Sequence, residues 1–156
     1  MTDPTRNAGG DTATMSGKTS GFRSLVGYHT VGWARDYGEI ELQLLPKHGN
    51  SIGITHGGVY MTIMDAAMGH ATTWCAVPGN VRICVTVSLT TNFIQPAKGK
   101  VIRAIGRLHG IHNRIGTVTA EVLDEDGTLL ASGQGAFRYS PGSENYDGVP
   151  KEQARR

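Results

Sequence analysis

Residues 57–76 read GGVYMTIMDAAMGHATTWCA and are the most apolar segment of the chain. A turn-rich segment, PKHGNSIGIT, precedes them, and Val77-Pro78-Gly79 follows, so the pattern predicts a helix from Gly57 to Ala76. Its apolar residues fall on every side of that helix, which indicates that other structure wraps it. The sequence therefore predicts one long central helix.

A single carboxylate, Asp65, lies inside this segment, and it is the only one between Glu41 and Glu121. A buried, unpaired carboxylate destabilises a fold or takes up a proton, so a chain that keeps one there has a use for it. Two interpretations stay open. Asp65 is a functional acid, or it is a core residue satisfied by backbone donors.

The rest of the chain is β in character. A short helix near Gly21–Tyr28 precedes one strand within Trp33–Leu45, where GEIELQLL alternates between apolar and polar residues. Four runs rich in Val, Ile and Thr follow the helix, at residues 82–96, 100–112, 115–127 and 128–140. The tetrapeptide DEDG at 124–127 predicts a hairpin turn. The fold class is α+β, with a curved, mostly antiparallel sheet around one helix and an exposed edge that favours oligomerisation.

The length of 156 residues suits one domain. Residues 1–20 and 141–156 contain almost nothing able to enter a core, so we expect a disordered N-terminal tail, a folded domain at 21–140 and a polar C-terminal tail. No apolar leader or membrane-spanning segment is recognisable, which predicts a cytoplasmic protein that does not bind membranes.

Charge and cysteine content narrow the possible ligands. The formal net charge of +2 is too small for a nucleic-acid binder, but basic residues and five of the six histidines concentrate between Glu41 and Glu121. An anionic small molecule is therefore plausible. The two cysteines, Cys75 and Cys84, form no CxxC motif, so we expect small core residues and neither a metal site nor a disulfide.

The stretch NSIGITHGG at residues 50–58, with Asp65 seven residues later, resembles the hotdog-fold acyl-CoA thioesterases of the phenylacetic-acid-degradation (PaaI-like) type. Gln95-Pro96-Ala97 and the DEDG turn extend the resemblance over most of the folded region. It implies a hotdog fold that hydrolyses an aryl or short- to medium-chain acyl-CoA, with coenzyme A as part of the substrate and no other cofactor. It also implies a homodimer as the minimal unit and a homotetramer as the larger assembly.

The resemblance assigns roles around the helix. The Gly57 backbone N–H, unpaired at the helix start, would polarise the thioester carbonyl. Asp65 would act as general base or as nucleophile, and the sequence does not separate the two. His56 and Asn50 would orient the loop, the carbonyl or the water, unless His56 only bonds to the backbone at the helix start. Thr86 would place a hydroxyl near the acid, unless it simply packs in its strand.

Substrate binding is assigned to two further groups. Asn113 and Arg114, in the turn between the third and fourth strands, and Gly58 would contact coenzyme A. Four helix residues would line the acyl pocket: Tyr60, Met61, Met64 and Met68. Methionines at helical spacing are more often core than pocket, so the alternative of a purely structural role stays open.

One distance predicts how the site is assembled. Gly57 and Asp65 are eight residues apart, or about 12 Å along a helix. One thioester carbon cannot lie within about 3.5 Å of both in the same chain. A dimer with antiparallel central helices, in which Gly57 of one chain faces Asp65 of the other, removes the difficulty, and the resemblance implies the same arrangement.

Two other functions remain as alternatives. A hydratase or dehydratase acting on acyl thioesters could use the same fold, although its usual histidine and acid pattern is not found here. A non-catalytic acyl-CoA binding protein is the second alternative. Turnover of an acyl-CoA that depends on Asp65 would separate an enzyme from a binder.

Overall fold

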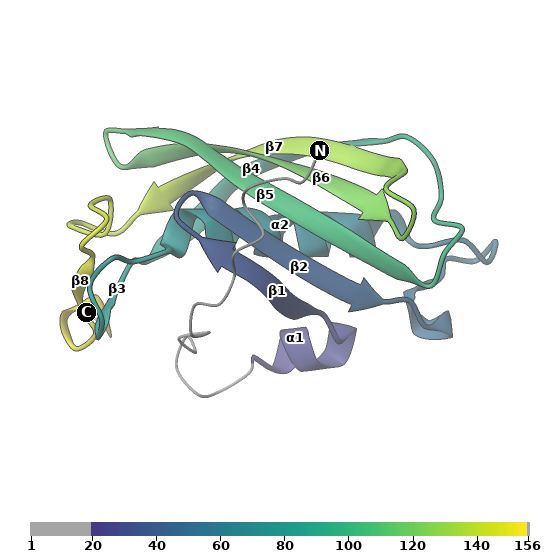
Figure 1. Cartoon of the computed structure of the whole chain (residues 1–156), viewed down its shortest axis with the longest axis horizontal. Helices are drawn as coiled ribbons and strands as arrows, with labels where there is room; N and C mark the ends of the chain where they lie inside the picture. The colour runs from purple at the N-terminus through teal and green to yellow at the C-terminus, as the bar shows by residue number, and fades with distance from the viewer. Residues whose placement is uncertain (1–19, 156) are drawn as a thin grey trace.

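The structure, a computed structural model, describes residues 20–155, so the predicted N-terminal tail lies outside the described residues except for Ser20. One curved antiparallel sheet wraps around one long helix (Figure 1). The strands follow the order β1-β2-β5-β6-β7-β4. Their bounds are β1 His29–Ala34, β2 Tyr37–Gln43, β4 Cys84–Phe93, β5 Val101–His112, β6 Ile115–Asp124 and β7 Leu129–Tyr139. The predicted α+β arrangement is confirmed.

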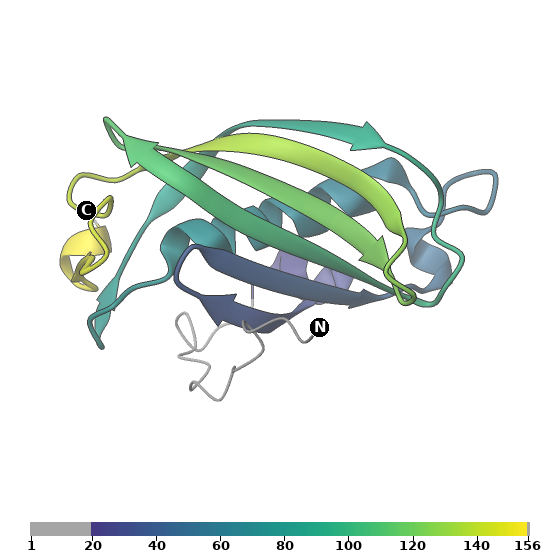
Figure 2. The same cartoon turned by 45° about the horizontal axis from the view of Figure 1, so that its top comes forward.

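The central helix α2 (Gly57–Thr73) lies against the concave face of the sheet (Figure 2). It ends three residues before the predicted Ala76, because Trp74 leaves helical geometry and its carbonyl accepts a bond from Arg82. Within residues 20–155, no helix is long and apolar enough to cross a membrane.

One face of α2 packs on the sheet. Its buried residues are Tyr60, Ile63, Met64, Ala67, Met68, Ala71 and Thr72, spaced three or four apart as in an amphipathic helix. The opposite face is not wrapped within the single chain: Met61 is 37% exposed and Asp65 is half-buried. The expectation of a helix covered on all sides is therefore wrong for one copy of the chain.

Helix and sheet approach each other closely at a pair of glycines. Gly38 of β2 and Gly106 of β5 are register partners, and a Cβ on either would collide with the backbone of Ala67. Only glycine lets the backbones approach this closely. The contact fixes the middle of α2, and with it the position of Asp65 two residues earlier.

Before the helix, the structure has a hairpin where one strand was predicted. Short helix α1 (Gly21–Val26) leads into β1, and β1 turns into β2 at Arg35-Asp36. Asp36 has a φ of 59°, and its Oδ1 accepts a bond from the Tyr146 hydroxyl at 2.6 Å. The turn contains neither glycine nor proline, so composition did not reveal it.

The C-terminal segment is polar in composition, as predicted, but residues 141–150 pack on the body and are not a free tail. Strand β8 (Val149–Pro150) pairs with β3 (Asn80–Val81), beyond the end of the main sheet (Figure 1). Arg82, 2% exposed, donates to the carbonyls of Ser143 and Glu144. No regular apolar pattern marks this contact, because the anchor bonds to backbone carbonyls.

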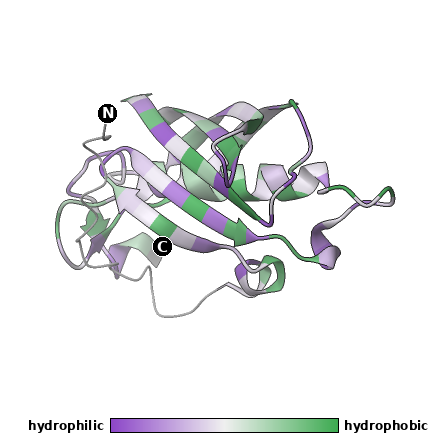
Figure 3. Ribbon diagram, turned by 45° about the vertical axis from the view of Figure 1, so that its right-hand side comes forward, coloured by the Kyte–Doolittle hydropathy of each residue, from purple (hydrophilic) through white to green (hydrophobic). Residues whose placement is uncertain are grey.

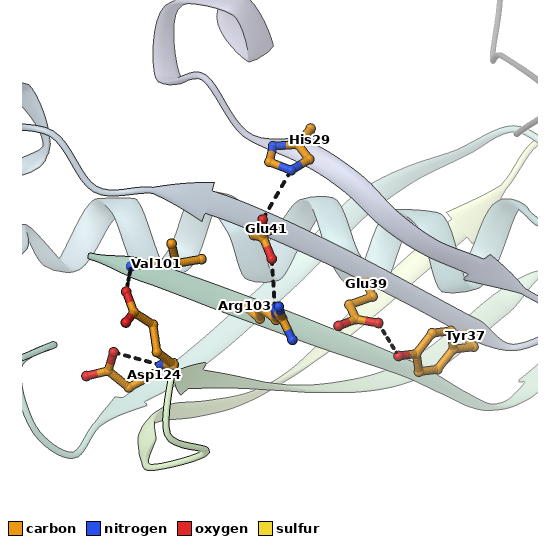
Figure 4. Close-up of polar contacts among 8 residues, drawn as sticks. His29, Tyr37, Glu39, Glu41, Val101, Arg103 and Asp124 are labelled. Atoms are coloured by element: carbon orange, nitrogen blue, oxygen red, sulfur yellow. Dashed lines mark hydrogen bonds and ion pairs between the residues drawn. The ribbon is translucent and has the colours of Figure 1, made fainter. Parts of the chain in front are cut away.

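The convex face of the sheet is polar where β1, β2 and β5 meet. Strands coloured by hydropathy alternate along their length (Figure 3), as expected for a sheet with one covered face. On the outer side, Glu41 contacts His29 at 3.3 Å and Arg103 at 2.8 Å (Figure 4). His29 and Arg103 are exposed and Glu41 is half-buried, so these contacts contribute little to stability.

Candidate active site

The first half of the candidate site is the start of α2. His56 caps the helix, because its Nδ1 accepts a bond from the Gly58 N–H at 2.9 Å. The neutral ring then carries its proton on Nε2, which is available as a donor because His56 is exposed. Among residues 20–155, no acceptor is found for the Gly57 N–H. This N–H points out of the helix start with the positive end of the helix dipole behind it.

These contacts specify two of the predicted roles. The Gly58 N–H is already bonded to the His56 side chain, so this group is not free for coenzyme A. His56 bonds to the backbone at the helix start, which was the alternative to a role in orienting the substrate, and its second ring nitrogen stays available. The two possibilities for His56 are therefore compatible.

Asn50 orders the loop before the helix. Its side-chain Oδ1 accepts bonds from the backbone N–H groups of Ile52 at 3.0 Å and Ile54 at 3.2 Å. Its backbone N–H donates to the Ile54 carbonyl at 2.8 Å. This arrangement is typical of asparagine at a turn. Of the predicted roles for Asn50, the geometry therefore favours orientation of the loop.

Phe93, the last residue of β4, also lies at the helix start, and the sequence reasoning missed it. Its ring atoms lie 3.2 Å from where a Cβ on Gly57 would be, and its ring centroid lies 6.2 Å from that of Tyr60. The side chain is 55% exposed. The signal in the sequence that could have identified Phe93 is its place as an aromatic residue directly after the polar run TTN.

The second half of the candidate site is Asp65, two turns further along α2. Its Oδ1 accepts a bond from the Thr86 hydroxyl at 2.7 Å, so the predicted neighbours are in contact. No backbone N–H bonds to this carboxylate among the described residues, which argues against a core aspartate held by backbone donors. The hydroxyl leaves Oδ2 available.

Groups on both sides of α2 lie within electrostatic range of Asp65. Burial raises the pKa of Tyr28, the nearby Arg23 guanidinium opposes the change, and the negative charge of Asp65 adds to it. Burial also raises the pKa of the Cys84 thiol, with a smaller contribution from Asp65. Gly69, one turn beyond Asp65, has open space where a Cβ would be. Asp65 therefore lies half-buried on the uncovered face of α2, between the two edges of the sheet.

The predicted acyl-pocket residues divide by helix face. Tyr60, Met64 and Met68 are at most 3% exposed and belong to the core under the sheet. The Tyr60 hydroxyl accepts a bond from the Ala97 N–H at 2.9 Å. Met61 is the one member of the four on the open face. Helical spacing could not reveal which face the sheet covers.

The remaining predicted residues lie at a different place. Asn113 and Arg114 form the tip of the β5–β6 hairpin, with φ angles of 48° and 64°. They line a cleft with the C-terminal segment and are far from the start of α2 (Figure 1). Within residues 20–155, no three His, Cys, Asp or Glu side chains gather as a metal site would require.

One chain therefore holds two half-sites. Gly57, His56, Asn50 and Phe93 gather at the helix start, and Asp65 with Thr86 gathers two turns later. The structure does not bring the two groups together. A free backbone donor and a hydroxyl-supported carboxylate are complementary parts of acyl-transfer chemistry, which needs a donor for the oxyanion and a base or nucleophile.

Comparison with known proteins gives a consistent result. The model of the thioesterase superfamily matches residues 52–131. A protein from Halobacterium salinarum, provisionally named an esterase, is 31% identical over 112 residues, which cover 65% of this chain and 74% of that protein. The solved structure of conserved protein PA5202 from Pseudomonas aeruginosa is 28% identical, with a TM-score of 0.69 over 78% of this chain and 95% of that one.

Another similar structure is the E. coli PaaI protein of the phenylacetic acid degradation operon. It has a TM-score of 0.68 and 16% identity over 78% of this chain and 85% of PaaI. At that identity the likeness shows the fold alone, and the fold agrees with the predicted PaaI-like hotdog arrangement. The matched region contains both half-sites except Asn50, and it ends before the C-terminal segment. This chain belongs to the thioesterase superfamily.

Proposed function

We propose that this protein is an acyl-CoA thioesterase whose active site combines Asp65 and Thr86 of one chain with Gly57 and His56 of a second. The observation that carries the proposal is the Asp65–Thr86 contact at 2.7 Å, on the uncovered face of a helix whose first N–H is unpaired among the described residues. This contact orients one carboxylate oxygen and leaves the other for chemistry.

Two chemical routes fit this geometry. As a general base, the free Asp65 oxygen takes a proton from water, and the resulting hydroxide attacks the thioester carbon. As a nucleophile, the same oxygen attacks that carbon and forms a mixed anhydride, which water then hydrolyses. In both routes, the carbonyl oxygen gains negative charge opposite the Gly57 N–H, the carbon–sulfur bond breaks, and the coenzyme leaves as its thiolate.

The second chain is argued from symmetry. In one chain, Phe93 contacts Gly57 and Thr86 contacts Asp65. A two-fold axis that places Gly57 opposite the partner's Asp65 passes near the midpoint of the two positions, at Met61. The matching midpoint on β4 lies between Leu89 and Thr90, so the same axis places Phe93 opposite the partner's Thr86. Antiparallel pairing of two β4 edges would therefore complete two sites at once.

The surface of β4 supports this pairing. The strand contains no charged residue and exposes Val85 and Val87 at 56% and 58%. A long uncharged edge strand is a template for pairing with another chain. Met61 and Phe93 would then lie at the interface near the acyl group. The aryl or short- to medium-chain substrate, the homotetramer and the cytoplasmic location are part of the same proposal.

The decisive experiment measures thiol release from a panel of aryl-, short-, medium- and long-chain acyl-CoAs. Asp65→Asn should lower kcat by about a hundredfold or more, because loss of a general base commonly has that effect. Asp126→Asn, which changes an exposed carboxylate in the DEDG turn, is the matched control. Folded, dimeric wild type that releases no thiol from any substrate, or an Asp65→Asn variant with full activity, would contradict the proposal.

A further inference from the structure

Helix α1 and strand β1 lie at the edge of the sheet opposite β4 (Figure 1), and the segment that joins them follows one flank of α2. One end of this segment is held by Thr30, whose hydroxyl lies 2.9 Å from His70 Nε2 near the end of α2. The other end is held by the Val26 carbonyl, which lies 2.8 Å from the Nε2 of buried His48. The His48 carbonyl accepts a bond from the His56 N–H at 2.9 Å, at the start of α2. The residues between Val26 and Thr30 therefore lie beside the middle of the helix.

Tyr28, in the middle of this segment, is level with Asp65. Tyr28 is two residues before Thr30, or about 7 Å along an extended chain toward the helix start. Asp65 is five residues before His70, or about 7.5 Å along the helix in the same direction. In agreement with this placement, burial raises the pKa of Tyr28, and the negative charge of Asp65 raises it further against the opposing effect of Arg23.

The side chain of Tyr28 points toward α2. Tyr28 and Thr30 flank His29, which lies on the outer side of the sheet and contacts Glu41 at 3.3 Å (Figure 4). Side chains of an extended chain alternate between opposite faces, so Tyr28 shares the inner side with Thr30. Tyr28 is half-buried and packs against the core. Among residues 20–155, no partner is found for its hydroxyl, which is protonated at neutral pH and can donate a bond.

Arg23 places a cation beside the Tyr28 ring. Its Nε donates to the Tyr28 carbonyl at 3.2 Å, and its guanidinium carbon lies 5.8 Å from the ring centroid. Burial lowers the pKa of His70, and the charge of Arg23 lowers it further, so the guanidinium also lies within electrostatic range of that ring. In the part of the chain that the structure describes, Arg23 forms no ion pair and its two Nη atoms have no partner. This flank therefore presents two donor groups without an acceptor.

Small side chains separate these donors from Asp65. Helical spacing places Thr62, Ala66 and Gly69 on the uncovered face of α2, and a Cβ on Gly69 would meet nothing within 4 Å. The face is about 10–12 Å wide, which is the diameter of a helix with its side chains. Contacts of about 3 Å at Asp65 and at Arg23 leave about 4–6 Å between them, the length of a chain of roughly four to six carbon atoms.

We propose that Arg23 and Tyr28 select acyl groups that end in a carboxylate, an inference that rests on the proposed thioesterase function. The β4 side of Asp65 is occupied by Thr86 and, in the proposed dimer, by the partner chain. The acyl chain of a thioester held at Asp65 would therefore extend over the uncovered face toward the two donors. The guanidinium and the phenol hydroxyl would both donate to the terminal carboxylate, in bonds that its charge strengthens. The substrates are then monothioesters of dicarboxylic acids with about four to six carbon atoms.

The test compares acyl-CoAs that have the same chain length and differ in the terminal carboxylate. Succinyl-, glutaryl- and adipyl-CoA are paired with butanoyl-, pentanoyl- and hexanoyl-CoA, and kcat/KM is measured for each. Wild type should prefer the carboxylate member of at least one pair. Arg23→Gln should lower that preference about tenfold, and Tyr28→Phe, which keeps the ring, about threefold. A merely structural defect would lower kcat/KM for both members of a pair and leave their ratio unchanged.

A matched control tests whether the preference depends on the position of the charge. Arg107→Gln removes the same charge from an exposed residue that lies over the Tyr37 ring on the outer side of the sheet. It should leave both the activity and the preference unchanged. An equal loss of preference in Arg107→Gln and Arg23→Gln would assign the effect to the net charge of the protein and overturn the inference.

Binding without turnover separates this inference from the proposed function. In the Asp65→Asn background, calorimetry should show tighter binding of the carboxylate member of the preferred pair, and Arg23→Gln should remove the difference. Equal kcat/KM within every pair in wild type, or a preference that survives both Arg23→Gln and Tyr28→Phe, would overturn the inference and leave the thioesterase function intact. Absence of thiol release from every substrate, with the difference in binding intact, would instead contradict the proposed function alone.

Discussion

The two edges of the sheet differ in length and in attachment to the helix. Strand β1 has six residues and an interrupted register after Thr30, and it is tied to α2 because the Thr30 hydroxyl lies 2.9 Å from His70 Nε2. The Trp33 indole N–H also donates to the His70 carbonyl at 2.8 Å. Strand β4 has ten residues, no charge and exposed valines. One edge is anchored to its own helix, and the other is open.

The difference supports the proposed position of the second chain. A short edge that is bonded to the helix resists pairing, whereas a long, uncharged edge with no such bonds invites it. The open edge is also the one that carries the hydroxyl next to Asp65. The proposed assembly and the proposed chemistry therefore use the same strand, and four experiments can break or sharpen this contrast.

The largest effect is expected from a charge on the open edge. Val87→Lys places an ammonium group in the proposed strand pair, where it would lose water or face its own copy. We expect monomers by light scattering and a loss of activity of at least a hundredfold, because each site needs two chains. Val31→Lys, at an exposed position of β1, is the matched control and should stay dimeric and active. A fully active monomeric Val87→Lys variant would show that the sites are not shared.

A smaller effect is expected from loss of the Gly57 N–H, and a second variant separates it from the effect of crowding at the same residue. Gly57→Pro removes the N–H at a helix position that tolerates proline, and loss of one oxyanion donor lowers kcat about 10²–10³-fold. Gly57→Ala keeps the N–H but brings a Cβ 3.2 Å from the Phe93 ring, so it controls for crowding. The alanine variant should retain most of the activity.

Mixing the proline variant with Asp65→Ala tests whether two chains share a site. In verified heterodimers, one of the two sites would contain neither substitution, so part of the activity should return. Absence of recovery would place both groups of a working site in one chain. Equal losses for Gly57→Pro and Gly57→Ala would assign the effect to crowding.

The smallest effect concerns the anchored edge and depends on pH. Burial lowers the pKa of His70, the bond to the Ala66 carbonyl opposes this, and Arg23 lowers it further. The unfolded chain then binds a proton more readily than the folded one. The stability that depends on neutral, buried His70 is therefore fully present above about pH 6.5 and is lost as the pH falls below that value.

Urea unfolding of wild type and His70→Gln between pH 5 and 8 measures this contribution. The free energy of unfolding of wild type should fall more steeply below about pH 6.5, by at most about 1.4 kcal/mol per pH unit for one proton. If the free energy of unfolding changed with pH in the same way for both proteins, protonation of His70 would not be what makes the anchored β1 edge sensitive to pH.

The sequence predicted those parts of the molecule that rest on local patterns. The apolar run from Gly57, the β-rich segments and the DEDG turn correspond to α2, the sheet and the β6–β7 hairpin. The nearness of Thr86 to Asp65 was implied by the family resemblance and is present in the structure. Local spacing and motif knowledge were sufficient for these elements.

Other features depend on contacts between distant segments and were missed for that reason. The hairpin at Asp36 is stabilised by Tyr146, 110 residues later. Residues 141–150 are held by backbone carbonyls that accept from Arg82, and backbone contacts leave no compositional signal. Met64 and Met61 have the same residue type and differ in whether the sheet covers their side of α2. Phe93 lies beside Gly57 because the sheet curves around the helix.

The paired glycines Gly38 and Gly106 have a consequence for substrate choice. Because they let the sheet touch the helix backbone at Ala67, no room for a guest molecule is left between sheet and helix at that point. In the proposed dimer, an acyl group would instead be accommodated between two copies, by side chains on the open side of α2. Selectivity for acyl size could then change by substitutions such as those at Met61 while the packed interior, and the stability it provides, stays the same.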